Sequence, residues 1–168
     1  MSVKKTLTLT LTLTLTAAAA AIGLSGAASA DGLGDKDESG RAMSDKALVI
    51  LTSDSRETQG MAMILSNAMQ QQGSDLRVLL CDQAGDLAVE GYQSAEPINT
   101  PPSNPAGQVT PEGILQMLMD NGAQVDVCAI YLPNRDYGEE VLRDGIGVAA
   151  PGPIAELMRD PTVSVSTF

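Results

Sequence analysis

Two cysteines are the side chains of this sequence best suited to covalent chemistry. Cys81 ends the apolar run DLRVLLC, and Cys128 lies within the apolar run VDVCAIYL. The chain has no histidine, which excludes both a cysteine–histidine pair and a serine–histidine–aspartate triad. Sulfur exchange remains open to these cysteines, because a thiolate attacks a disulfide or persulfide sulfur without a general base.

Three interpretations of Cys128 follow from the residues alone. The thiol can be a small apolar side chain in a buried strand. It can also form a disulfide with Cys81, as expected of a secreted protein with two cysteines. The third interpretation is a reactive thiol, whose pKa Arg135 would lower from seven residues further on. A short helix expected near Gly138 would add to this effect, whereas the acidic residues that follow Arg135 would oppose it.

Metal and phosphate sites are not predicted. There is no G-x-x-x-x-G-K-[ST] loop, and the acidic residues of GDKDESG lack the spacing of a calcium-binding EF-hand. Met61, Leu65 and Met69 recur at a spacing of four residues, which raises the possibility of copper-binding thioethers. We interpret this stripe as the buried face of a helix. We therefore expect neither a metal nor a cofactor.

Residues 1–30 have the pattern of a cleaved signal peptide. Lys4 and Lys5 precede an uncharged apolar stretch, and the small residues of ASA end at Ala30, directly before Asp31. We expect cleavage after Ala30 and a periplasmic or secreted protein. No later stretch approaches the roughly 18 apolar residues of a membrane-spanning helix, so no stable membrane insertion is expected after processing.

The chain that remains after cleavage suits one domain with its own core. Residues 31–45 are polar and glycine-rich and are expected to form a flexible linker, so the domain would cover residues 46–168. Removal of Lys4 and Lys5 changes the net charge from −11 to −13. This charge argues against a nucleic-acid partner, whose phosphates would be repelled.

Apolar runs and stretches of helical character alternate along this domain. The apolar runs predict strands at 46–54, 75–81, 124–133, 146–150 and 162–168. Helical spacing and capping residues predict helices at 55–73, 110–123, 136–145 and 151–161. The proline-rich stretch between the second strand and the second helix, 92–109, is predicted to be a long loop.

Continuous apolar strands separated by helices are typical of a parallel sheet that helices cover on both faces. We therefore predict an α/β fold, a three-layer α/β/α sandwich with a mainly parallel sheet of about five strands. Such folds bind ligands at the carboxyl ends of their strands. Cys81 and Cys128 are both expected at or near such ends.

The stretch that begins VDVCAIYLPNRDYG and runs to the end of the sequence resembles the second half of the DsrE/TusD-like (DsrE/DsrF-like) family of small sulfur-relay proteins. In that family a cysteine ends the third strand, and basic residues and a glycine follow it. Cys128, Arg135 and Gly138 fall at these positions, and Val165 and Phe168 match the end of the family pattern. The stretch RVLLCDQAGDLAVEG resembles the family's second strand and the loop after it.

The resemblance extends over residues 46–168 and implies a function. Cys128 would accept sulfur as a persulfide and pass it on, with sulfur donor and acceptor proteins or small sulfane-sulfur compounds as partners. Family members are typically oligomers, so a homo-oligomer such as a trimer is expected. For an exported chain, this implies a periplasmic sulfur carrier or sulfurtransferase-like protein. Two alternatives remain: a binding or assembly module with structural cysteines, and a thiol–disulfide redox protein that uses Cys81 with Cys128.

Overall fold

A computed structural model of the chain describes residues 45–103 and 106–168. The expected signal peptide and almost all of the expected linker lie outside the described residues. The main sheet has five strands, in the order β6-β5-β2-β1-β7, and every neighbouring pair is parallel. These strands are β1 (Lys46–Leu51), β2 (Asp75–Leu80), β5 (Gln124–Cys128), β6 (Ile146–Ala149) and β7 (Val163–Thr167). The α/β sandwich with a parallel sheet of about five strands is therefore confirmed.

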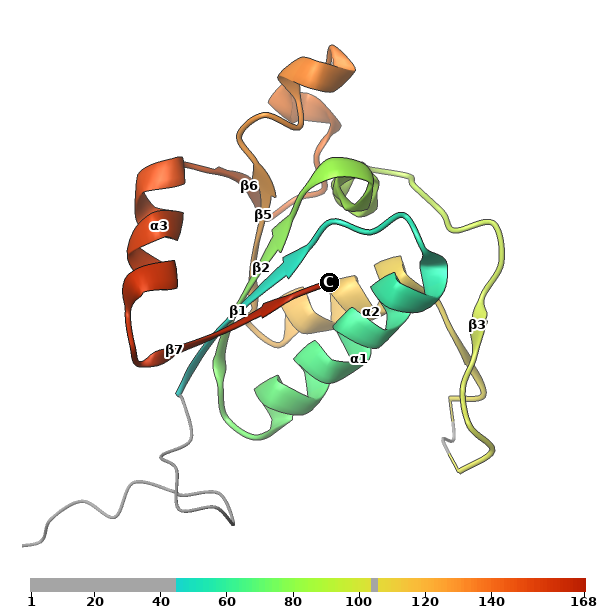
Figure 1. Cartoon of the computed structure of the whole chain (residues 1–168). Helices are drawn as coiled ribbons and strands as arrows, with labels where there is room; N and C mark the ends of the chain where they lie inside the picture. The colour runs from blue at the N-terminus through green and yellow to red at the C-terminus, as the bar shows by residue number, and fades with distance from the viewer. Residues whose placement is uncertain (1–44, 104–105) are drawn as a thin grey trace, which may run out of the picture. The chain divides into compact units, whose positions relative to one another are not determined.

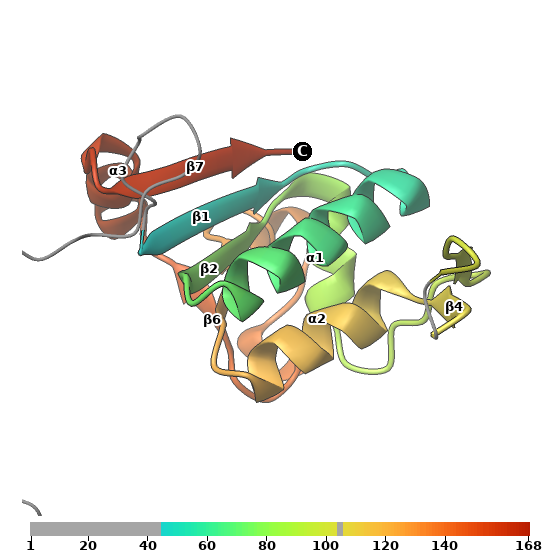
Figure 2. The same ribbon diagram turned by 90° about the horizontal axis from the view of Figure 1, so that it is seen from below.

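The helices cover the two faces of this sheet unequally. Helices α1 (Arg56–Gln71) and α2 (Pro111–Asp120) lie side by side on one face, and α3 (Pro151–Arg159) lies on the other (Figures 1 and 2). The larger hydrophobic core fills the α1–α2 face. The smaller core, around Leu48, Leu79, Ala149 and Ile154, lies on the α3 face. A single nine-residue helix leaves part of the α3 face accessible.

Capping residues set the ends of the two long helices as the sequence predicts. Ser55 and Thr110 cap α1 and α2 by accepting backbone N–H groups with their side-chain oxygens, and Pro111 occupies the first turn of α2. Gly73 and Gly122 follow the helix ends with φ of +93° and +94°. Glycine adopts this left-handed conformation without the steric penalty that a Cβ atom brings.

The methionine stripe of α1 does not form its buried face, so that interpretation is wrong for two of its three residues. Met61 and Leu65 are 53% and 43% exposed, and Met69 is partly buried. The buried positions of this helix include Ala62 and Met63 instead. The sequence GMAMIL is apolar on several sides of the helix, so its periodicity does not determine which side faces the sheet.

The strand that carries Cys128 is shorter than the apolar run predicts. β5 ends at Cys128, and residues 129–132 form a turn in which Tyr131 donates its N–H to the carbonyl of Cys128 at 2.8 Å. Tyr131 and Leu132 are buried in the larger core, which explains why the apolar run continues past the strand. The helix expected over 136–145 is a single 3-10 turn, η3 (Glu139–Val141).

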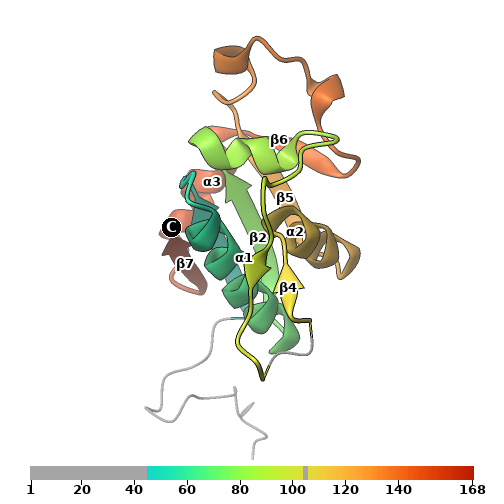
Figure 3. The same cartoon turned by 90° about the vertical axis from the view of Figure 1, so that its right-hand side faces the viewer.

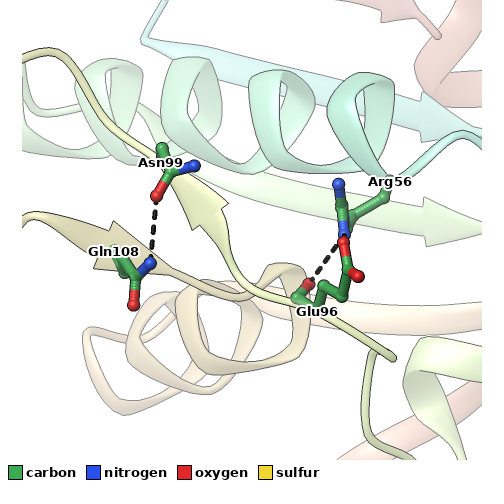
Figure 4. A network of polar contacts seen from close by, with 4 residues as sticks. All are labelled: Arg56, Glu96, Asn99 and Gln108. Atoms are coloured by element: carbon green, nitrogen blue, oxygen red, sulfur yellow. Dashed lines mark hydrogen bonds and ion pairs between the residues drawn. The ribbon is translucent and has the colours of Figure 1, made fainter.

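The proline-rich loop contains a small antiparallel hairpin. Strands β3 (Ile98–Asn99) and β4 (Gln108–Val109) pair beside α1 and α2 (Figure 3). Figure 4 shows two polar contacts in this segment: Glu96 accepts hydrogen bonds from Arg56 at the start of α1, and Asn99 accepts one from Gln108. Among residues 45–103 and 106–168, no helix has the length and apolar character required to cross a membrane.

Candidate thiol–disulfide site

The register of two neighbouring strands brings the cysteines together. Leu80 of β2 pairs with Val127 of β5, so the residues that follow them, Cys81 and Cys128, lie opposite one another at the carboxyl edge of the sheet. Their Cα atoms are 5.1 Å apart and a disulfide joins them. A Cα separation of roughly 4.4–6.8 Å is usual for disulfides. The disulfide is therefore the one of the three sequence-based interpretations that the structure displays.

Backbone hydrogen bonds hold both cysteines in place. Cys81 donates its N–H to Leu51 of β1 at 2.9 Å and accepts the N–H of Ala84 at 3.1 Å. Its successor, Asp82, has a φ of +50°, a left-handed conformation that aspartate tolerates better than most residues. The chain thereby leaves the sheet into the 3-10 helix η1 (Asp82–Ala88). Cys128 accepts the N–H of Tyr131, so each cysteine stands between a strand and a fixed turn.

An apolar pocket of about 280 Å³ lies next to Cys128 on the α3 face. Leu79 and Ala149 contribute to its walls from the sheet, and Ile154 and Met158 contribute from α3. Ile130, which is 72% exposed, lines it from the turn after β5. Cys128 lines this pocket, which distinguishes it from Cys81, the other cysteine of the bridge.

Arg135 joins the segment after Cys128 to the segment after Cys81. Its guanidinium donates a hydrogen bond to Gln83 at 3.0 Å and lies 3.5 Å from a carboxylate oxygen of Asp86, both in η1. It also lies 5.5 Å from the ring centroid of Tyr131, a distance at which a cation is attracted to the ring. The expectation that Arg135 lowers the pKa of the Cys128 thiol stays a prediction, because its described partners are these three side chains.

Tyr131 completes this network between the two segments. Its hydroxyl donates a hydrogen bond to Asp86 at 2.8 Å. Burial of the ring, followed by this hydrogen bond and the charge of Asp86, raises the pKa of Tyr131 well above its usual range. A Cβ atom at Gly85 would collide with the Tyr131 ring, so glycine at this position permits the close approach of η1.

The sequence predicts the two cysteines and Arg135 as site residues, but it does not predict the pocket. The helix that lines the pocket does carry a signal, because Pro151, Ile154, Ala155 and Met158 follow the i, i+3, i+4, i+7 spacing of an apolar stripe. The sequence does not show that this stripe faces Cys128. Within the described part of the chain, no group of three or more cysteine or carboxylate side chains is arranged to hold a metal ion.

The fold has relatives among solved structures. The ychN protein from E. coli matches with a TM-score of 0.59 at 19% identity, over 75% of this chain and 100% of that chain. MTH1491, a protein of unknown function from Methanobacterium thermoautotrophicum, matches with a TM-score of 0.51 at 12% identity, over 73% of this chain and 98% of that chain.

The fold is therefore YchN-like. At these identities the likeness establishes the fold alone, because one fold supports many functions. No protein-family model matches the sequence, and no curated protein matches it. The cysteine pair and its surroundings therefore provide the basis for a functional proposal.

Proposed function

We propose that the protein is an exported sulfur carrier that accepts sulfane sulfur as a persulfide on Cys128. The observation that supports this proposal is the position of Cys128: it ends a strand, lines an open apolar pocket and lies within bonding distance of a second thiol. The DsrE/YchN-like fold adds support at the level of the fold. Its partners would be sulfur donor and acceptor proteins or small sulfane-sulfur compounds.

Loading requires the reduced form of the pair. The Cys128 thiolate attacks the terminal sulfur of a donor persulfide, R–S–SH. The donor S–S bond breaks, the R–S⁻ thiolate leaves, and Cys128 carries –S–SH. An acceptor thiolate can then attack this terminal sulfur, which moves the sulfur on and restores the Cys128 thiolate.

Cys81 provides a second way to discharge the persulfide. Its thiolate attacks the Sγ atom of Cys128, the bond to the terminal sulfur breaks, and hydrosulfide leaves. The product is the Cys81–Cys128 disulfide, which is the state that the structure displays. A further cycle then needs two electrons from a dithiol reductant.

The disulfide also favours a second candidate function, a thiol–disulfide redox protein. In that function the pair exchanges electrons with a partner dithiol and never carries an extra sulfur. The spacing of the cysteines, 47 residues apart, differs from the C-x-x-C arrangement of thioredoxin-like proteins. A purely structural bridge in a binding or assembly module is the remaining alternative.

Intact-mass measurement of the reduced protein after incubation with a persulfide donor tests the proposal. We expect a lasting gain of about 32 Da per sulfur on Cys81→Ser, a transient gain on wild type before internal discharge gives the disulfide, and no gain on Cys128→Ser. The Cys81→Ser variant should retain its sulfur longer, because the internal discharge step is missing. Loading of Cys128→Ser but not of Cys81→Ser would reverse the assignment. Failure of both folded, reduced single variants to gain sulfur from several donors, with no conversion of reduced wild type to the disulfide, would reject the carrier function.

Export and assembly belong to the same proposal. A disulfide is compatible with an oxidising compartment such as the periplasm. We propose that the mature protein begins at Asp31 and forms a homo-oligomer, such as a trimer. N-terminal sequencing of the periplasmic fraction tests the first point, and light scattering after size-exclusion chromatography tests the second. A periplasmic protein that begins at Met1, or a monomer at all concentrations, would contradict them.

A further inference from the structure

The apolar pocket next to Cys128 restricts which sulfur donors can bind, provided that Cys128 is the sulfur acceptor proposed above. Every residue that lines this pocket is apolar or is Cys128 itself. A negatively charged donor would have to leave water for walls that offer it no charged or hydrogen-bonding side chain, which is costly. The net charge of the chain, −11, opposes the approach of an anion as well.

The size of the pocket limits the donor further. Its volume of about 280 Å³ lies just below the roughly 300–1,000 Å³ of typical small-molecule sites. A short hydrocarbon group fits this space, whereas a peptide-sized donor would extend beyond it. Ile130 and Met158 line the pocket and are 72% and 54% exposed. A hydrocarbon group between them would remove apolar surface from water, which is favourable.

We propose that this pocket binds the hydrocarbon group of a small, uncharged organic persulfide, R–S–SH, and thereby places its terminal sulfur against the Sγ atom of Cys128. The Cys128 thiolate then attacks that sulfur. The new bond joins Sγ to the terminal sulfur, the old S–S bond breaks, and R–S⁻ leaves with the bonding electrons while the proton stays on the transferred sulfur. The group R contacts Ile154 and Met158 throughout.

The positions of the two cysteines relative to the pocket also explain why Cys128, and not Cys81, receives the sulfur from this donor. Both cysteines pack against the smaller core of the α3 face, but it is Cys128 that lines the pocket. A donor held in the pocket therefore lies against Cys128, which makes Cys128 the nucleophile toward an apolar donor.

A matched pair of donors tests the inference. The parent protein is the reduced Cys81→Ser variant, in which Cys81 cannot discharge the persulfide, and all further substitutions are made in it. It is incubated with 4-methylbenzyl hydropersulfide or with 4-carboxybenzyl hydropersulfide, and the rate of sulfur gain is followed by intact mass. Each rate is divided by the rate at which the same donor loads glutathione, which removes differences in intrinsic reactivity. We expect the parent protein to prefer the uncharged donor roughly tenfold or more, because the carboxylate would lie in apolar surroundings.

Two lysine substitutions at equally exposed methionines provide the control. Met158→Lys places a cation at the pocket, whereas Met61→Lys places one on the exposed face of α1, where the native side chain is 53% exposed. Met158→Lys should reduce or reverse the preference for the uncharged donor, and Met61→Lys should leave it unchanged. Met158→Gln serves the same purpose if the lysine variant does not fold.

The outcomes separate this inference from the proposed function. If the parent protein gains sulfur from both donors at equal normalised rates, the carrier function stands but the pocket does not select the donor. An equal effect of Met158→Lys and Met61→Lys would show that net charge, and not the pocket, sets the preference, and would overturn the inference. If the parent protein gains no sulfur from these donors or from inorganic polysulfide, the proposed function itself fails.

Discussion

Arg77 of β2 donates to a single carboxylate oxygen of Asp126 in β5, from Nε at 2.9 Å and from Nη2 at 2.8 Å. The Asp126 side chain is only 8% exposed. This ion pair joins the same two strands that the disulfide joins at their carboxyl ends. The neighbouring strand carries Gly147, where an added Cβ atom would come within 2.8 Å of Asp126.

Removal of one partner of this ion pair should destabilise the fold. In Asp126→Ala the Arg77 charge loses its partner in a largely buried position, and we expect a loss of about 3–5 kcal/mol in the free energy of unfolding. Urea denaturation of the oxidised protein measures this loss. The double variant Arg77→Met/Asp126→Leu should be closer to wild type, because it leaves no unpaired charge. Equal stability of Asp126→Ala and wild type would show that the pair contributes little.

Reduction of the Cys81–Cys128 bridge should lower stability. The bridge closes a loop across a sequence separation of 47 residues, and loop-closure entropy then gives a stabilisation of about 4 kcal/mol. Thermal unfolding with and without a phosphine reductant measures the difference. The Cys81→Ser/Cys128→Ser variant is the control, because the reductant should not change its melting temperature. A wild type equally stable in both states would argue against a structural contribution of the bridge.

Alkaline pH should weaken the network around Tyr131. The folded state raises the pKa of Tyr131 through burial and the hydrogen bond to Asp86, so its contribution is fully present below the ordinary tyrosine pKa of about 10. It is lost as the pH rises from there toward the folded-state pKa. Tyr131→Phe should cost about 1 kcal/mol at neutral pH and should show a weaker decline of stability above pH ~10. Parallel declines in both proteins would contradict this account.

Acidic pH should release the start of the proline-rich loop from α2. Ser94 donates its N–H and its hydroxyl to the two carboxylate oxygens of Glu112, at 3.0 and 2.6 Å. Burial alone would raise the pKa of Glu112, but the hydrogen bonds from Ser94 and from the backbone lower it below its ordinary value of 4.5. The contribution is therefore present above that value and is lost as the pH falls through the lowered pKa.

Amide hydrogen exchange of residues 92–99 measures this release. Exchange corrected for its intrinsic pH dependence should be slow in wild type near neutral pH and faster at about pH 3. Glu112→Gln should exchange faster already at neutral pH, because the carboxylate acceptor is missing. Gln116→Ala, one turn further along the exposed part of α2, is the control and should behave as wild type.

Arg135 should tune the Cys128 thiol through its charge. In reduced Cys81→Ser protein, Arg135→Met should raise the pKa of Cys128, because a cation near a thiol favours the thiolate. The pH dependence of Cys128 alkylation measures that pKa. Arg56→Met removes another ion-paired arginine, whose partner is Glu96, and should leave the alkylation profile unchanged. An unchanged profile in Arg135→Met would restrict Arg135 to its contacts with Asp86 and Tyr131.

The fold class could be predicted from the sequence because it depends on local signals. In β1 the apolar run is continuous from Ala47 to Leu51, and capping residues such as Thr110 mark the helix ends. The strand order could not be predicted, because it depends on which strands pair with one another across long stretches of sequence. The end of β5 differs from the predicted end at residue 133 for a related reason. Tyr131 and Leu132 are apolar, as strand residues often are, but they are buried in a turn.

The candidate site shows the same division. Two cysteines at strand ends pointed to the carboxyl edge of the sheet, and the structure places Cys81 and Cys128 there. Their direct opposition follows from the pairing of Leu80 with Val127, which no local pattern encodes. The pocket depends on the position of α3 beside Cys128, and the partners of Arg135 depend on the path of η1. These are tertiary relationships between segments that are distant in the sequence.

The pairing of Leu80 with Val127 has a consequence for how the protein matures. In the folded protein the pairing of β5 with β2 brings Cys81 and Cys128 together. The chain has two cysteines, so the native bridge is the only disulfide that a single molecule can form. An oxidising environment therefore cannot trap a monomer with a wrong internal pairing. No disulfide isomerase is needed to correct the bridge, at whatever stage of folding it forms.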